Sequence, residues 1–331
     1  MEQTFYKNPL QYKSIETAAY EAVDYIDQRR HFKLKSLATK WSKFNYLCMG
    51  GIEPNVLYTV AGISGSGKSS FVNSLESDLF EQNPKASIAI LNFSFEMLSA
   101  RQVGRKLSYN LNKTTKELYS GDYKNPLNDE DFKRVEESVE NIKKLPIYYV
   151  DTPGTVEQIR TTIKHFILNE GKGKWVIIIL DHTLLTKGKT GESERITLAD
   201  LQRLFIEVKK YSRTTIIQLS QLNRNIEESD RIANQSMHYP MRKDIFGADS
   251  LFQASDYVLV IHRPEIIGIE NAYGLACLPV KDMIYLHFLK NREGELAILP
   301  FSNNLKYNRM DEVTLPKKEE EQQTSKKQLQ I

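Results

Sequence analysis

One segment of the sequence has the residue types and the spacing of a phosphate-binding loop. It reads GISGSGKS over 62–69 and matches the pattern G-x-x-x-x-G-K-[ST] at every fixed position. Glycines let main-chain N–H groups reach phosphate oxygens, and the amino end of a following helix adds partial positive charge. Lys68 supplies a cation for the β- and γ-phosphates, and the Ser69 hydroxyl is a Mg²⁺ ligand. The loop predicts a site for ATP or another nucleoside triphosphate, formed by Gly62, Ile63, Ser64, Gly65, Ser66, Gly67, Lys68, Ser69 and Ser70.

Three more polar residues directly follow predicted strands and can serve the same site. Asp181 ends an apolar run and is placed to hold Mg²⁺ or its water shell, the alternative being a turn-capping aspartate. Glu96 can orient or deprotonate water, unless it only stabilises the first turn of a helix. Gln221 can hydrogen-bond a γ-phosphate, or it can belong to an ordinary polar loop. His182, beside Asp181, is expected to be packed or hydrogen-bonded rather than a ligand.

These residues require a sheet that brings the ends of several strands together. From about 46 to 310, short apolar runs alternate with helical patterns, which is typical of crossover helices on a parallel sheet. The fold class is therefore α/β with a mostly parallel central sheet. Strands are expected at 56–61, 87–93, 146–150, 175–181, 214–219, 257–261 and 284–289, and helices at 69–80, 128–144 and 197–211.

Two polar segments flank this region. In residues 1–45, Ser14 can cap a helix that runs to about Arg30 and carries one narrow apolar stripe, as a helical linker would. Residues 311–331 are rich in Lys, Glu and Gln and are expected to be a disordered tail. A polar insertion of unknown role occupies about 112–145. The expected domains are thus 1–45, 46–310 and 311–331.

Composition narrows the setting in which the chain works. The chain has 331 residues, and 45 Lys and Arg against 42 Asp and Glu give a net charge of +3, too small to imply a nucleic-acid partner without local basic surfaces. No apolar run is long enough to cross a bilayer, and the first residues lack a secretory pattern, so we expect a cytoplasmic protein without a membrane partner. Cys48 and Cys277 exclude a disulfide framework, and both are expected to be packed thiols.

Several segments, in this order, resemble the C-terminal ATPase domain of DnaB-type replicative helicases. The similarity covers about 40–307 and rests on the phosphate loop together with FSFEM at 93–97, VDTPG at 150–154, VEQIR at 156–160, IQLSQLNR at 217–224, ASDYVLVIHRPE at 254–265 and LKNREG at 289–294. The resemblance implies a RecA-like P-loop NTPase core. It also implies that Glu96 is the catalytic glutamate and that Gln221 lies in the sensor motif.

The same resemblance gives a role to two cations near the end of the chain. Lys290 and Arg292 would reach the γ-phosphate bound to the adjacent subunit of a homo-hexameric ring, as an arginine finger does. Without the resemblance, the two residues would be interpreted as a solvated basic hairpin.

The sequence also departs from the family. Only about 45 residues precede the core, so the N-terminal primase-binding domain is expected to be absent, which suggests a phage or plasmid type with separate primase and loader. The family's DNA-facing stretch reads DIFGAD at 244–249, without the family's Arg and Glu. Contacts to single-stranded DNA are therefore assigned to two flexible basic loops, at Lys187, Lys189, Arg224, Arg242 and Lys243, although ordinary solvated charges explain such residues equally well.

The resemblance implies an NTP-dependent DNA helicase that translocates on single-stranded DNA and unwinds duplex during replication. Two alternatives stay open. One is a RecA- or RadA-like recombination ATPase that forms filaments. The other is an ATP-dependent loader or adaptor that binds DNA without unwinding it.

Overall fold

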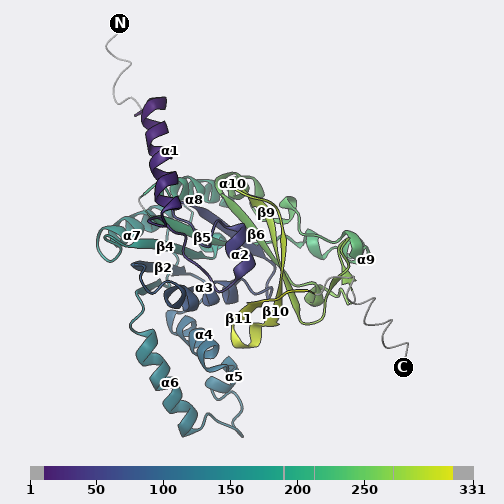
Figure 1. The fold of residues 1–331 in the computed structure, drawn as a ribbon. Helices are drawn as coiled ribbons and strands as arrows, with labels where there is room; N and C mark the ends of the chain where they lie inside the picture. Colours follow the sequence, from purple (N-terminus) through teal and green to yellow (C-terminus); the bar gives the residue numbers. More distant parts are fainter. Residues whose placement is uncertain (1–10, 189–190, 212, 271, 316–331) are drawn as a thin grey trace, which may run out of the picture. The chain divides into compact units, whose positions relative to one another are not determined.

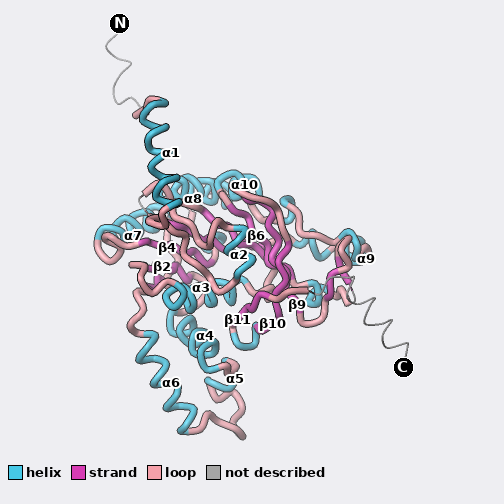
Figure 2. Tube along the Cα trace, in the orientation of Figure 1, coloured by secondary structure: helices cyan, strands magenta, loops and turns pink. Residues whose placement is uncertain are grey.

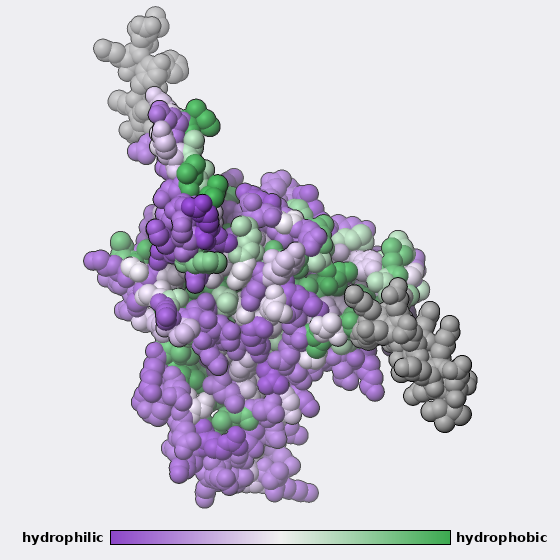
Figure 3. Space-filling model, viewed as in Figure 1, coloured by the Kyte–Doolittle hydropathy of each residue, from purple (hydrophilic) through white to green (hydrophobic). Residues whose placement is uncertain are grey.

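The computed structural model describes residues 11–188, 191–211, 213–270 and 272–315. Contacts divide the chain into two units, Met1–Ser36 and Leu37–Ile331. The first unit contains helix α1 (Ile15–Arg30), whose start is capped by Ser14 as predicted, since the Ser14 side chain accepts a hydrogen bond from the amide of Thr17. None of its residues is buried, and Figure 3 shows apolar side chains along it.

Within the described residues, the second unit is built on one nine-stranded sheet in the order β11-β10-β9-β6-β1-β5-β4-β2-β3 (Figures 1 and 2). Six neighbouring strands are parallel: β1 (Leu57–Gly62), β2 (Ile88–Ser94), β3 (Ile147–Val150), β4 (Trp175–Asp181), β5 (Thr214–Gln221) and β6 (Tyr257–His262). The antiparallel part consists of β9 (Met283–Asn291), β10 (Ile298–Asn304) and β11 (Arg309–Glu312). A separate hairpin pairs β7 (Ala272–Tyr273) with β8 (Leu278–Pro279).

Helices cover both faces of the sheet. The second unit contains α2 (Ser42–Leu47), α3 (Lys68–Gln82), α4 (Ser99–Leu111), α5 (Thr115–Leu118), α6 (Asp129–Ile142), α7 (Val156–Leu168), α8 (Glu194–Val208), α9 (Ser229–Ala233) and α10 (Ala248–Ala254). Figure 1 places α3 and α4 on one side of the sheet and α7, α8 and α10 on the other. No helix of the described chain is both long and apolar enough to span a membrane.

Strand β4 shows why the sheet is covered on both sides. Its side chains alternate: Ile177 and Ile179 pack with α2 and α3, whereas Ile178 and Leu180 pack with α7 and α8. Because successive residues of a strand face opposite sides, a strand covered on both faces must be apolar throughout. The predicted parallel strands are confirmed, with ends that differ by one or two residues.

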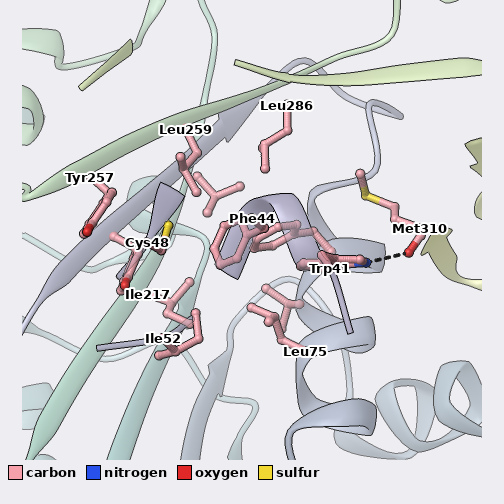
Figure 4. Close-up of a cluster of buried hydrophobic side chains, with 14 of the residues drawn as sticks. Trp41, Phe44, Cys48, Ile52, Leu75, Ile217, Tyr257, Leu259, Leu286 and Met310 are labelled. Carbon is pink, nitrogen blue, oxygen red and sulfur yellow. Dashed lines mark hydrogen bonds between the residues drawn. The ribbon is translucent and has the colours of Figure 1, made fainter. Parts of the chain in front are cut away.

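The core begins earlier than the sequence indicates. Trp41 and Phe44 are fully buried, and the Trp41 ring nitrogen donates to the carbonyl of Met310 at 3.0 Å (Figure 4). The chain therefore divides after Ser36, rather than near residue 45. A six-residue helix is too short for its apolar spacing to be recognised in the sequence.

The core also ends later. Strand β11 includes Asp311 and Glu312, and the Glu312 carboxylate accepts from the amides of Lys43 and Phe44 at the start of α2. A tail that begins at 311 is therefore wrong, and residues 316–331 lie outside the described residues. Cys48 is buried as expected, but Cys277 is exposed.

Candidate functional site

The carboxyl ends of the central parallel strands lie at one edge of the sheet, and the predicted site residues gather there. Gly62 at the end of β1 pairs with Gln221 at the end of β5. Asp181 at the end of β4 pairs with Ser94 at the end of β2, and the Asp181 carbonyl accepts from the amide of Phe95. This is the edge at which open α/β sheets bind ligands.

The loop from Gly62 to Ser69 has the backbone of a phosphate cradle. Gly67 precedes α3 with a φ of +110°, a conformation that favours glycine. At Gly62 a Cβ atom would lie 2.3 Å from the Ser66 hydroxyl and 2.8 Å from the carbonyl of Ile261. Both glycines are therefore required by the loop itself, and α3 directs its amino end towards the space above the loop.

Lys68 folds back over this loop. Its ammonium donates to the carbonyls of Gly62 at 2.8 Å and Ile63 at 3.0 Å. Burial lowers the pKa of Lys68, and the negative charges of Asp181 and Glu96 oppose that shift. The ammonium is thus held at the loop by weak neutral acceptors, which a phosphate can replace.

Asp181 is a buried carboxylate, 4% exposed, whose Oδ1 has no partner among the described residues. Burial raises its pKa to about 6, and Glu96 raises it further, against the influence of Lys68 and Arg105. An unpartnered carboxylate oxygen is costly unless something else satisfies it. His182 accepts from the amide of Leu184 and is nearly buried, so it is a packed residue as expected.

The donor set fits Mg²⁺ better than a transition metal. No group of three or more His, Cys, Asp or Glu side chains in the described chain can hold a metal by itself. Mg²⁺ commonly takes one or two protein oxygens and completes its shell with water and phosphate. Asp181, with its orphaned Oδ1, and Ser69 at the start of α3 are the residues that would hold it.

Glu96 and Gln221 lie at the same edge. Glu96 is exposed just beyond β2, and its charge acts on both Lys68 and Asp181. The sequence reasoning missed Arg105, a half-buried residue of α4 whose charge is felt by Asp181 and whose own pKa is lowered by burial. A cation four residues after Arg101 on a helix that follows Glu96 was the available signal.

The basic loops follow β4 and β5. Lys187 is exposed, and its amide donates to the carbonyl of Gly154, while Lys189 lies outside the described residues. Arg224 is exposed just beyond β5. Arg242 and Lys243 are exposed as well, and Arg242 pairs with Asp249 at 3.0 Å.

The loop after β5 is tied down, in contrast to the flexible loop that the sequence suggested. Its two ends pair through Leu222 and Ile245. Arg231 forms an ion pair with the fully buried Asp244 at 2.7 Å, so Arg231 holds the loop rather than projecting from it. Tyr239 packs against Tyr273 and is not presented for stacking on bases.

Lys290 and Arg292 lie at the opposite edge. Asn291 pairs with Tyr257, which pairs in turn with Tyr58 near the start of β1. At about 3.3 Å per residue, the four residues from Tyr58 to Gly62 place these cations roughly 13 Å away along the strands. The two cations cannot serve the phosphate loop of their own subunit.

A family model described as the DnaB-like helicase C terminal domain matches residues 36–312, most of the chain. The chain belongs to the DnaB-like helicase family. The matched residues begin and end close to the compact unit seen in the structure, and they include the phosphate loop and both edges of the sheet.

Several relatives of this DnaB-like chain are replicative DNA helicases. The replicative DNA helicase DnaC of Bacillus subtilis is 24% identical over 93% of this chain and 64% of its own length. The DnaB of Buchnera aphidicola subsp. Schizaphis graminum is 25% identical over 81% of this chain and 53% of its own. The DnaB of Mycobacterium leprae is 27% identical over 57% and 30%. The chain thus spans less than two thirds of these helicases.

Solved structures confirm the RecA-like fold. A structure described as the ATPase domain of a protein of this kind superposes with a TM-score of 0.74 at 17% identity, covering 92% of this chain and all of the other. A DnaB-like replicative helicase, studied with its interactions with primase, gives a TM-score of 0.71 at 16% identity over 92% of this chain and 68% of the other.

Proposed function

We propose that this chain is the ATPase subunit of a DnaB-like helicase, which hydrolyses ATP or another NTP with Mg²⁺ and moves along single-stranded DNA to separate duplex strands during replication. The observation that supports this proposal most strongly is the split of the site between two edges of one sheet. The nucleotide-binding residues and the cations at Lys290 and Arg292 are at opposite ends of the strands. A complete site then needs two subunits, as in a ring.

At the carboxyl edge, each residue has a defined task. The loop amides and Lys68 bind and orient the phosphates, and Asp181 and Ser69 hold Mg²⁺, which neutralises phosphate charge when bound. Glu96 orients or deprotonates the attacking water, and Gln221, next to Gly62 in the sheet, senses the γ-phosphate. Burial of Asp181 and Lys68 lowers the local dielectric and strengthens these interactions.

At the amino edge, Lys290 and Arg292 stabilise the transition state on the neighbouring subunit. A guanidinium that reaches the γ-phosphate only in an assembled ring couples hydrolysis to ring geometry, and such a group contributes about 10³–10⁵-fold in rate. Lys187, Lys189, Arg224, Arg242 and Lys243 would contact the DNA backbone. We propose a homo-hexamer in the cytoplasm, with primase and a loader as separate partners.

Mixed rings test the shared site. Arg292→Ala should bind nucleotide normally yet lose hydrolysis by about 10³–10⁵-fold. Glu96→Gln should be inactive through the other half of the site. Rings assembled from both variants contain some sites with an intact Glu96 and an intact neighbouring Arg292, so hydrolysis should recover at intermediate ratios. Absence of recovery at every ratio would contradict a site shared between subunits.

The two alternatives give different results with DNA. Strand displacement on a forked substrate is expected for a helicase, whereas ATP hydrolysis stimulated by single strands without displacement would favour a loader or adaptor. Closed rings in negative-stain images support the helicase, and helical filaments would favour the recombination ATPase.

A further inference from the structure

Arg292 is held by one nearly buried carboxylate at the amino edge of the sheet. Asp256 directly precedes β6, and its Oδ1 lies 3.3 Å from the Arg292 Nε. The Asp256 side chain is 9% exposed and that of Arg292 is 51% exposed. The Nε end of the guanidinium is therefore anchored in the protein, and the two terminal nitrogens are at its outer end.

Asp256 makes contacts with every polar atom that it has. Its amide donates to the carbonyl of Leu57 at 2.9 Å, and its carbonyl accepts from the amide of Arg292 at 3.1 Å. Its Oδ2 accepts from the amide of Leu57 at 2.9 Å and from the ammonium of Lys209 at 2.7 Å. One residue thus connects the first residue of β1 with the residue that follows β9.

From these contacts we infer that Asp256 is the positioning residue for Arg292, an inference that rests on the trans-acting role proposed above. Arg292 is pinned through its backbone, but a long side chain retains rotamer freedom unless its Nε is fixed. Phosphate is best recognised by two parallel N–H groups, which the terminal nitrogens supply once Nε is occupied. Ordering the guanidinium before it meets the neighbour's nucleotide lowers the entropic cost of that contact.

Lys290 shows by contrast what the carboxylate adds. Its ammonium donates to the carbonyl of Phe252 at 2.6 Å and lies over the Phe252 ring. Burial lowers the pKa of Lys290, and the nearby positive charge of Arg292 acts in the same direction. Lys290 therefore has a neutral anchor, whereas Arg292 has a charged one, which makes the orientation of Arg292 sensitive to Asp256.

The direct test is Asp256→Asn, which keeps the side-chain volume and an acceptor for the Leu57 amide. Hydrolysis by assembled rings should fall by about 10- to 100-fold, the effect of misplacing a reacting group by about 1 Å. Binding of a fluorescent ATP analogue should stay within about twofold of the wild-type chain. Asp256→Glu, which restores the charge, should recover part of the rate.

Mixed rings distinguish positioning from a merely structural role. Asp256→Asn leaves Glu96 intact and impairs only the site of the neighbour, so mixing it with Glu96→Gln should restore hydrolysis at intermediate ratios, as Arg292→Ala does. If Arg292→Ala complements Glu96→Gln but Asp256→Asn does not, the role of Asp256 is overturned while the shared site survives. If neither variant complements, the shared site itself fails.

Two further variants control for folding. Lys209→Met removes the other cation from Asp256 and leaves the contact with Arg292, so the rate should change by less than about twofold. A loss as large as that of Asp256→Asn would show that Asp256 serves the packing of Lys209, and would overturn the inference. Asp200→Asn, which breaks the exposed ion pair with Arg203, is the matched control and should behave as the wild-type chain.

Discussion

The two edges of the sheet place their functional groups by different means. At the carboxyl edge, backbone geometry does the work: Gly62 allows a close approach to Ser66, Gly67 takes a left-handed conformation, and α3 starts directly at Lys68. At the amino edge, side chains hold side chains, with Asp256 on Arg292 and the Phe252 carbonyl on Lys290. A backbone device leaves a pattern in neighbouring residues, whereas a side-chain device joins residues far apart in the sequence.

The largest effect should come from breaking the carboxyl edge at Lys68. Lys68→Ala removes the cation that meets the β- and γ-phosphates, so hydrolysis should fall by at least about 10²–10³-fold, and nucleotide binding should weaken with it. Steady-state phosphate release and titration with a fluorescent nucleotide measure the two losses. Lys85→Ala, at an exposed lysine after α3, is the matched control.

This prediction separates the edges, because Arg292→Ala should spare nucleotide binding. Hydrolysis that continues undiminished in Lys68→Ala would remove the assignment of the loop. Equal loss of nucleotide affinity in both variants would mean that the two edges do not divide binding from catalysis.

The contrast between the edges also explains what the sequence could predict. Strand β4 was placed at its observed bounds, and the loop at 62–69 was assigned with its strand and helix, because both depend on local patterns. Helix α4 was missed since its buried residues include Gln102, Lys106 and Ser108, and no apolar period marks it. Lys106 is satisfied by an ion pair with the buried Glu76 on α3, a partner that the sequence does not reveal.

Long-range pairs account for the other omissions. Strand β10 contains Pro300 and ends in two asparagines, and β11 is mostly charged, so neither resembles a strand in the sequence. Both are specified by their antiparallel neighbours. Asp256 is 36 positions from Arg292, and only the pairing of β6 with β9 brings them together.

A smaller effect is expected on stability at the carboxyl edge. The folded-state pKa of Asp181 is raised to about 6 by burial, from an ordinary value of 3.8, so its ionised form costs folding free energy above pH 6. Asp181→Asn should therefore stabilise the nucleotide-free chain at pH 7 by about 3 kcal/mol or less. The gain should shrink as the pH falls through 6 and disappear below about pH 4, where the carboxyl is neutral in both states.

Urea unfolding at pH 7 and at pH 4, without Mg²⁺ and nucleotide, measures this difference. Asp200→Asn serves as the control, because its carboxylate belongs to an ion pair at the surface. A destabilised Asp181→Asn at pH 7 would mean that the carboxylate is held by protein groups and is not reserved for a ligand. The same variant should lose Mg²⁺-dependent hydrolysis, so stability and function would change in opposite directions.

The smallest effect concerns DNA and compares one cation from each edge. Arg224 follows β5 at the carboxyl edge, whereas Lys290 lies at the amino edge. If Arg224 contacts one phosphate of a single strand, Arg224→Gln should lower the slope of log affinity against log salt by about 0.7, and weaken binding roughly three- to fivefold at moderate salt. Lys290→Gln, an equal loss of charge, should leave the slope unchanged, because its ammonium is assigned to a nucleotide. Fluorescence anisotropy with a labelled oligonucleotide and a non-hydrolysable nucleotide, at several salt concentrations, gives both slopes. A reduced slope for Lys290→Gln would place DNA at the amino edge, and an unchanged slope for Arg224→Gln would show that this arginine is an ordinary solvated charge.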